Sequence, residues 1–309
     1  MNKNHDFAPD FFVVGAPKGG TTAVFHWLKG HPEVFLPDVK EPGYFAYSNR
    51  SAVPRSGPYD PNYHAQITVD GEDYAKLYES AEDRLTGDIS PVYLVDKTVA
   101  ARIASIRPDA RIIVMLRDPV ERAFSQFLHH VRDGLEPFAA FEAALEQEAA
   151  RLEAGWSWGH GYATHGHYAS QIDSYLDAFH RDQILFLEFA QLNAEPDACW
   201  RQICDHLGIQ QMPLEHNERV NVTSNLATVP SRPAITHAIR HPGRIQQQLK
   251  RLIPENARKR LRKMFEGDGK PLPRLQHTTR RALAIRYKTE RTSIEAQTGL
   301  SLDHWTRAD

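Results

Sequence analysis

The sequence predicts an α/β protein: a doubly wound parallel sheet with a P-loop-like first turn, flanked by helices and followed by a basic helical region. Short apolar runs at residues 11–14, 111–116 and 184–189 are typical of buried parallel strands. Helical patterns separate these runs, and this alternation favours parallel pairing with helices on both faces. A glycine-bearing turn follows the first run, and strand, glycine turn and helix form an arrangement that binds phosphates.

The composition is that of an ordinary globular chain. Of the 309 residues, 41% are hydrophobic, 10% aromatic and 25% charged, which excludes a disordered, collagen-like or disulfide-stapled protein. Cys199 and Cys204 lack the spacing of a zinc or redox motif and favour a reducing compartment. The first apolar run, residues 11–16, is too short for a signal core or a membrane span. We therefore expect a cytoplasmic protein.

The N-terminal part is predicted to begin with a strand, a turn and a helix. After the strand at residues 11–14, Thr21 or Thr22 can cap the helix through its side-chain oxygen. Gly30 ends that helix, because a proline follows two residues later and cannot continue it. Residues 39–84 are rich in Pro, Gly, Ser, Asp and Tyr without sustained periodicity, so we expect long loops there, of a kind that often carries function.

Strands and helices alternate through the rest of the core. The strands are expected at Leu85–Ile89, Arg111–Leu116 and residues 184–189, and the helices at residues 96–106, 119–134, 138–154 and 168–179 and in a segment that ends at Leu207. Asp118 can cap the helix that follows the second of these strands, with Pro119 at its first position. Glu121 stands where a capping box has its glutamate.

The C-terminal region carries a strong positive charge. Residues 240–291 hold 16 Lys and Arg against 4 Asp and Glu, within a chain whose net charge is -2. We predict an α/β core over residues 1–235 and a basic helical extension over residues 236–309 that packs on it. The charge can be a solvated helical face, or it can attract nucleic acid, a membrane or another polyanion. A noncatalytic polyanion-binding protein is therefore one alternative function.

The turn at residues 15–22 is predicted to bind an anion. Its glycines allow a tight turn, and the helix behind it supplies unpaired N–H groups and a positive dipole end. In a kinase-type P-loop the lysine directly precedes Ser or Thr, but here Lys18 lies three residues before Thr21. Because the usual lysine and hydroxyl serve a triphosphate and magnesium, we expect a different, metal-free anion. A P-loop kinase or nucleoside triphosphatase is the alternative enzyme.

A second anion site is predicted at the end of the strand Arg111–Leu116. Arg117 follows that strand, at the edge where open α/β sheets bind ligands, and Ser125 lies about two turns into the next helix. A guanidinium and a hydroxyl suit a phosphate monoester. Arg122 shares the helical face of Ser125 and can assist it or face solvent.

Residues 14–22, 116–127 and 40–45 together resemble the three marker regions of sulfotransferases that use 3′-phosphoadenosine 5′-phosphosulfate (PAPS). The resemblance covers about residues 10–235. The Lys-Glu-Pro sequence at residues 40–42, which aromatic residues follow, is closer to the heparan-sulfate and bacterial carbohydrate branch than to the aryl and steroid branch.

The resemblance implies a set of donor-binding residues. The 5′-phosphosulfate would be held by Lys18, Gly19, Gly20, Thr21 and Thr22. The 3′-phosphate would be bound by Arg117 and Ser125, and a looser similarity over residues 221–233 adds Arg232 as a candidate 3′-phosphate ligand. Lys18 would also stabilise the negative charge that develops on the bridging oxygen as the sulfuryl group departs.

The same resemblance implies the acceptor chemistry. Glu41 corresponds to the carboxylate that acts as general base on the acceptor, although a loop glutamate can also merely pair with Lys40. His129 and His130 are the competing bases, because the aryl branch uses a histidine. Ile89 stands where heparan-sulfate enzymes usually have lysine, which argues against a highly anionic glycosaminoglycan. The implied reaction sulfates a hydroxyl, or less readily an amine, of a carbohydrate or small metabolite.

Neither a metal nor a nucleic-acid partner is expected. His160, His165 and His167 lack a carboxylate or thiol at a recognisable ligand spacing. The aromatic residues around these histidines can shape an acceptor pocket or belong to the core; they are Trp156, Trp158, Tyr162 and Tyr168.

Overall fold

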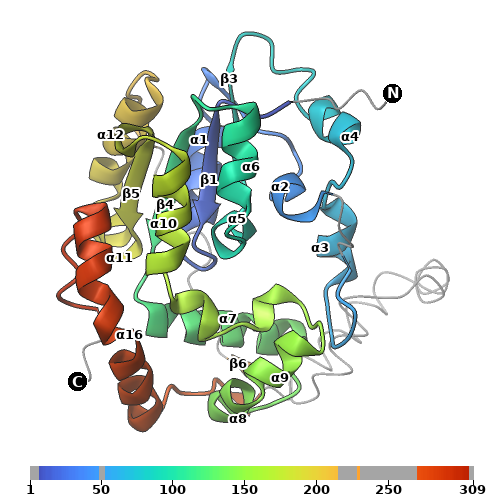
Figure 1. The fold of residues 1–309 in the computed structure, drawn as a ribbon, viewed down its shortest axis with the longest axis vertical. Helices are drawn as coiled ribbons and strands as arrows, with labels where there is room; N and C mark the ends of the chain where they lie inside the picture. The colour runs from blue at the N-terminus through green and yellow to red at the C-terminus, as the bar shows by residue number, and fades with distance from the viewer. Residues whose placement is uncertain (1–6, 49–52, 215–227, 230–269, 306–309) are drawn as a thin grey trace, which may run out of the picture.

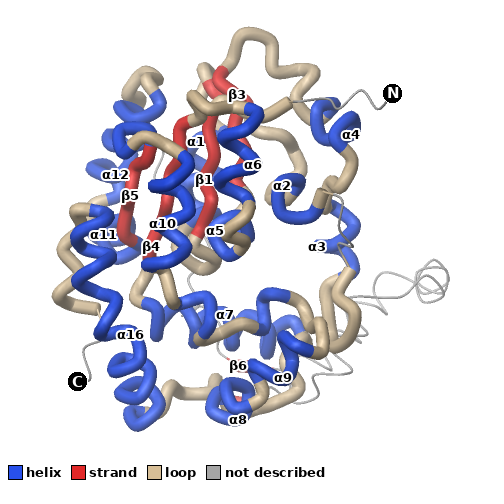
Figure 2. Tube along the Cα trace, viewed as in Figure 1, coloured by secondary structure: helices blue, strands red, loops and turns tan. Residues whose placement is uncertain are grey.

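A computed structural model describes residues 7–48, 53–214, 228–229 and 270–305 of the chain. At its centre is a five-stranded sheet in the order β2-β3-β1-β4-β5, and every neighbouring pair is parallel. Figure 1 and Figure 2 show the strands side by side with helices around them. The strands are β1 (Phe11–Gly15), β2 (Val34–Phe35), β3 (Leu85–Ile89), β4 (Arg111–Leu116) and β5 (Ile184–Glu188). Four of these strands were predicted. Strand β2 was not, because a strand of two residues is too short to show an alternating or continuous hydrophobic pattern.

Helices cover both faces of the sheet, which confirms the doubly wound prediction. One face packs against α5 (Val92–Val95), α6 (Val99–Ile106) and α10 (Ala169–Ala178) around a core that includes Phe12 and Val14. The opposite face packs against α1 (Thr21–Lys29) and α12 (Pro196–Leu207). Side chains alternate between these two cores along β1, and both sides are fully buried. This is why the strand reads as an uninterrupted apolar run.

Helix α7 (Pro119–Asp133) follows the carboxyl end of β4, and in Figure 1 the strands point toward it. Asp118 caps it by accepting hydrogen bonds from the amides of Val120 and Glu121, as predicted. The Glu121 carboxylate does not complete a capping box. It instead lies between two guanidinium groups, those of Arg117 and Arg280. A long-range ion pair thus replaces the predicted local contact.

Three helical predictions need correction. Helix α1 begins after Gly20 without a side-chain cap, so neither Thr21 nor Thr22 has the predicted capping role. The helix expected over residues 96–106 starts only at Val99. Residues 138–154 form two helices rather than one, α8 (Phe141–Glu146) and α9 (Glu148–Glu153). The second begins at Glu148, whose buried carboxylate accepts hydrogen bonds from the amides of Ala163 and Thr164. That contact lies far along the chain and is invisible to periodicity.

The segment predicted as long loops contains three short helices, α2 (Tyr44–Tyr47), α3 (Pro61–Gln66) and α4 (Gly71–Lys76). Asp60 and Asp70 cap the last two by accepting amide hydrogen bonds. None exceeds six residues, so none shows a helical repeat in the sequence. Helices α2 and α3 carry Tyr47 and Tyr63, two tyrosines that lie close to Glu41.

The C-terminal helix α16 (His277–Thr298) packs on the core. Its Tyr287 hydroxyl donates a hydrogen bond to the carbonyl oxygen of Ala163 at 2.8 Å, and Thr279 donates to Glu142. Two further strands of two residues each, β6 (Thr228–Val229) and β7 (Lys270–Pro271), pair in antiparallel fashion. The predicted division between residues 1–235 and 236–309 lies outside the described residues and stays a prediction. Among the described helices, none is long and apolar enough to cross a membrane.

Candidate active site

The turn between β1 and α1 has the geometry of an anion cradle. Gly20 has a φ of 99°, a left-handed conformation that favours glycine. A side chain at Gly19 would lie 2.7 Å from the Met115 carbonyl oxygen, so only glycine fits there. The first helical hydrogen bonds run from the amides of Ala23 and Val24 to Gly20. The amides before them have no partner within the helix and, with the helix dipole, favour an anion.

Lys18 lies inside this turn, also with a left-handed φ of 67°. Burial lowers the pKa of its ammonium group to about 8, and the nearby guanidinium groups of Arg132 and Arg117 act in the same direction. Asp133 and Glu41 oppose that shift. The positive charges around Lys18 are not fully balanced by carboxylates. An anionic ligand that binds here would therefore be attracted to them.

Arg117 reaches back to the turn from the end of β4. Its guanidinium donates a hydrogen bond to the Lys18 carbonyl oxygen at 3.2 Å and lies 4.5 Å from the centre of the Phe189 ring. Tyr168 donates a hydrogen bond to the Arg117 carbonyl oxygen at 3.0 Å. The structure thus brings Lys18 and Arg117 together at the carboxyl edge of the sheet, as predicted from the sequence.

Ser125 has a hydroxyl group that lacks a protein partner. The residue is buried on α7, and its Oγ makes no hydrogen bond to any described part of the chain. A buried hydroxyl almost always has a partner, and a phosphate oxygen is one. The residues present therefore fit the predicted phosphate ligand. Arg122 is buried, and its guanidinium donates to the carbonyl oxygen of Tyr162 instead of facing solvent.

Glu41 also lies near the turn. Lys40 connects them: its Nζ donates to Thr22 Oγ1 at 2.8 Å and lies 3.2 Å from Glu41 Oε1. Glu41 is 23% exposed, so an acceptor can reach it. The sequence predicted Lys40 only as an ion-pair partner of Glu41, and its contact with Thr22 was not predicted. The one indication of a role for Lys40 in the sequence is that it directly precedes Glu41.

A buried carboxylate supports the loop that carries Glu41. Ser90 accepts a hydrogen bond from the Gly43 amide at 3.1 Å and donates one to Asp88 at 2.6 Å. Tyr93 accepts one from the Phe45 amide and donates one to Asp88 at 2.7 Å. Burial raises the pKa of Asp88 to about 6, although its hydroxyl partners act against this shift. The sequence pointed to residues 86–93 as a segment near the acceptor, but the supporting role of Asp88 was not predicted, because only the fold brings the amides of Gly43 and Phe45 to its hydroxyl partners.

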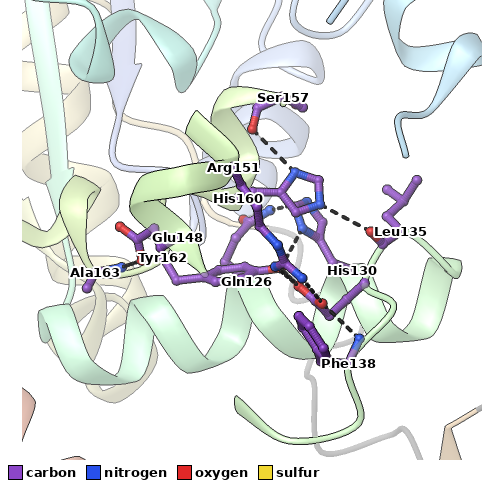
Figure 3. Close-up of polar contacts among 11 residues, drawn as sticks. Gln126, His130, Leu135, Phe138, Glu148, Arg151, Ser157, His160, Tyr162 and Ala163 are labelled. Carbon is purple, nitrogen blue, oxygen red and sulfur yellow. Dashed lines mark hydrogen bonds and ion pairs between the residues drawn. The ribbon is translucent and has the colours of Figure 1, made fainter. Parts of the chain in front are cut away.

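The two candidate histidine bases are in different surroundings. His130 belongs to a buried chain in which Tyr162 donates to Glu136 at 2.7 Å and lies 2.9 Å from His130 Nδ1 (Figure 3). Gln126 lies 2.9 Å from the other ring nitrogen, Nε2. Since the Tyr162 proton goes to Glu136, these contacts assign the His130 proton to Nδ1. Both ring nitrogens are therefore engaged within the protein.

His129 points elsewhere. Its Nε2 lies 3.2 Å from the carboxylate of Asp133, and its Nδ1 is buried without a partner among the described residues. Burial lowers the pKa of His129 to about 3, with the charge of Lys18 contributing. His129 is thus near the site but has little affinity for a proton.

Apart from Trp158, whose indole lies near Tyr47, the remaining sequence candidates do not converge on the site. Tyr162 and Tyr168 are fully buried in the core. Ile89, at the position compared with lysine, is buried against the α1 side of the sheet. The three histidines proposed as a weak metal candidate bond elsewhere, His160 to Leu135, His165 to Trp158 and His167 to Glu290. The described residues contain no group of three metal-ligating side chains. Arg232 lies outside the described residues.

Fold and site together define a P-loop-like α/β protein whose lysine lies inside the first turn instead of directly before its threonines. Comparison with known proteins identifies the class more narrowly. The chain belongs to the sulfotransferase family, because the family model described as "Sulfotransferase family" matches residues 9–213. The resemblance noted in the marker regions is confirmed.

The chain is similar to named sulfotransferases. It is 27% identical over 218 residues to mouse heparan sulfate glucosamine 3-O-sulfotransferase 3A1, covering 70% of this chain and 49% of that protein. It is 26% identical over 279 residues to human heparan sulfate glucosamine 3-O-sulfotransferase 6, and the match covers 84% of this chain and 72% of that protein. The chain thus spans about half the length of the first of these relatives. A sulfotransferase structure from Alicyclobacillus acidocaldarius has the same fold, with a TM-score of 0.73 at 24% identity. The match covers 97% of this chain and 100% of that protein's chain.

Proposed function

We propose that the chain transfers a sulfuryl group from PAPS to a hydroxyl group of a carbohydrate or small metabolite. One observation carries the proposal: at one edge of the sheet, two cations, Lys18 and Arg117, lie beside the glycine turn, and the nearby helix α7 carries the unpartnered hydroxyl of Ser125. These are the groups that two separate phosphates of one nucleotide require. The sulfotransferase relatives support a sulfated product, and those named for heparan sulfate glucosamine support a carbohydrate acceptor.

The donor would lie across the strand ends. Its 5′-phosphosulfate would be received by the amides of the turn, by Lys18 and by the threonines that follow. Its 3′-phosphate would be bound by Arg117 and Ser125. No metal is needed in this arrangement, because the charge is neutralised by side chains and by the start of α1.

Glu41 would take the proton of the acceptor hydroxyl. As the acceptor oxygen forms its bond to sulfur, the bond between sulfur and the bridging oxygen breaks and its electron pair stays on the departing nucleotide phosphate. Lys18 would stabilise that charge. Lys40, which contacts both Thr22 and Glu41, would hold the base in line with the turn. His129 is a weaker candidate, since its pKa is lowered to about 3 by burial and nearby charge.

Calorimetric titration with 3′-phosphoadenosine 5′-phosphate (PAP) in the absence of divalent ions tests the donor. We expect binding that Lys18→Ala and Ser125→Ala each weaken by tenfold or more, since each loses a contact with a charged group. Ser125→Ala should leave the thermal midpoint of the empty protein unchanged, because its hydroxyl has no protein partner. Equal or tighter binding of ATP with magnesium would instead support a P-loop kinase or nucleoside triphosphatase.

The base assignment is tested separately. Glu41→Gln should abolish sulfate transfer while leaving PAP affinity within about twofold, because the carboxylate acts on the acceptor and not on the nucleotide. His129→Gln is the matched variant and should retain transfer. If Glu41→Gln turned over normally and His129→Gln did not, the base would be His129.

A further inference from the structure

Three buried polar groups without partners gather beside Glu41. Tyr47 ends α2, Tyr63 lies within α3, and Trp158 begins the short helix η1 (Trp158–His160). The two hydroxyl groups and the indole Nε1 are shielded from solvent, yet none makes a hydrogen bond of good geometry to the described residues. Buried polar groups are almost always hydrogen-bonded. Three such groups without a well-formed hydrogen bond in one place therefore indicate a ligand-binding site.

The three side chains are neighbours although they come from distant parts of the sequence. Tyr47 and Trp158 pack against the same hydrophobic core. The His64 ring stands edge-on to both tyrosines, with ring centres 6.3 Å from Tyr47 and 5.4 Å from Tyr63. The two phenols and the indole lie within hydrogen-bonding reach of one another and act on one another's pKa, but none of these contacts has the geometry of a good hydrogen bond.

The charges around the two phenols are negative. Burial raises the pKa of Tyr47 and of Tyr63, and Glu41 acts on both in the same direction, so both remain neutral. Asp96 adds to the effect at Tyr47. A second anion brought to this place would be repelled, whereas an uncharged group would not.

Two cations that the structure describes in this neighbourhood, Lys40 and Arg102, are already engaged. Lys40 is bonded to Thr22 and Glu41. Arg102 donates to the Phe45 carbonyl oxygen and to the Ser48 hydroxyl. Neither is left to offset a carboxylate or sulfate on an incoming acceptor.

We propose that Tyr47, Tyr63 and Trp158 form the acceptor subsite and hold an uncharged, hydroxyl-bearing ring compound against Glu41. The inference rests on the proposed sulfotransferase function and adds the class of its acceptor. An indole N–H only donates, whereas a phenol donates and accepts, so the three groups together match the hydroxyl groups of a polyol. Their aromatic faces supply apolar contact for its ring. The acceptor is thus neutral, in contrast to a sulfated or carboxylated glycan.

Two glycosides that differ in one charge test the acceptor class. With PAPS as donor, p-nitrophenyl β-D-glucoside should be sulfated with a kcat/KM at least tenfold above that of p-nitrophenyl β-D-glucuronide. Mass spectrometry of the products gives both rates. A preference for the glucuronide would overturn the proposal, and so would the failure of both glycosides with a protein that binds PAP.

Single substitutions test the three residues. Tyr47→Phe, Tyr63→Phe and Trp158→Phe should each raise the KM for the glucoside about fivefold or more, since each removes one hydrogen bond. PAP affinity and the thermal midpoint should stay unchanged. Tyr175→Phe is the matched control, because its hydroxyl is buried but already bonded to the Tyr93 carbonyl oxygen at 3.0 Å. It should lower the thermal midpoint and leave KM unchanged.

The opposite pattern has a clear meaning. If the three variants lowered the thermal midpoint and left KM unchanged, the groups would be structural and the subsite proposal would be wrong. If the wild-type protein did not bind PAP, the proposed function itself would fail. PAP binding together with an unchanged KM would overturn the subsite alone.

Discussion

Lys18 combines two properties that usually exclude each other in a protein: it is largely removed from solvent, and its neighbours include two more cations. Burial and the charges of Arg132 and Arg117 lower its pKa to about 8. Near pH 8 the empty site therefore holds Lys18 partly as the neutral amine. An anionic ligand in the turn favours the ammonium form and raises the pKa again.

The affinity for PAP should consequently depend on pH. Below pH 8 Lys18 is charged before the nucleotide arrives, whereas above pH 8 binding must take up a proton. We expect affinity to fall from pH 7 to pH 9.5, with a slope approaching tenfold per pH unit. Calorimetry in two buffers of different ionisation enthalpy would measure the accompanying proton uptake.

Two variants make this test specific to one residue. Lys18→Met should bind PAP weakly at every pH and abolish the uptake. Lys29→Met, which alters a partly exposed lysine at the other end of α1, should behave as the wild type. An affinity that stayed flat through pH 8 in the wild-type protein would show that Lys18 keeps its proton throughout.

At the scale of elements, a buried ion pair connects α9 with the loop that follows α7. Arg151 makes two hydrogen bonds of 2.9 Å to Glu136, whose carboxylate is fully buried (Figure 3). Tyr162 and His130 extend the network onto α7, the helix that also bears Ser125 and His129. The position of that helix, and so of the phosphate-binding hydroxyl, depends on this connection.

Arg151→Met should lower the free energy of unfolding by about 3–5 kcal/mol, because it leaves Glu136 buried and unpaired. In the double variant Arg151→Met/Glu136→Gln the charge is gone as well, so it should be more stable than Arg151→Met alone. Urea unfolding measures both values. Lys76→Met, in an exposed ion pair, is the control and should leave the unfolding midpoint unchanged. A double variant no more stable than Arg151→Met would argue against a coupled network.

At the scale of the whole molecule, the last described residue, Trp305, packs against the central sheet. Trp305 is 2% exposed, and its indole donates a hydrogen bond of 2.6 Å to Glu188, the last residue of β5. Its ring packs 5.9 Å from that of Tyr168. The C-terminal helix and the residues after it, which belong to the predicted extension over residues 236–309, thus share the core.

Trp305→Ala should therefore destabilise the entire α/β core, by about 3–5 kcal/mol. Unfolding followed by circular dichroism should stay a single transition that shifts to lower denaturant. Ile285→Ala, at a 63% exposed position on α16, is the control and should change stability by less than about 0.5 kcal/mol. A separate early transition in the Trp305 variant would indicate that the C-terminal part folds independently.

Much of the fold could be predicted because its signals are local. Phe11–Gly15 and Arg111–Leu116 read as strands since both faces are buried, and Asp118 caps α7 with amides only two and three residues away. The break between α8 and α9 was not predicted. Glu148, where α9 begins, accepts hydrogen bonds from amides fifteen and sixteen residues further on, and such distant contacts leave no local pattern in the sequence.

The parallel α/β architecture and the lysine-bearing glycine turn could be predicted from the amino-acid sequence, because backbone conformation, capping and burial period depend on residues close together in the chain. The fold was needed to show that Lys40 joins Thr22 to Glu41, that His130 is engaged in the core, and that Tyr47, Tyr63 and Trp158 meet. Hydrogen bonds and charges act over a few ångströms in space. Folding, and not sequence spacing, sets those distances.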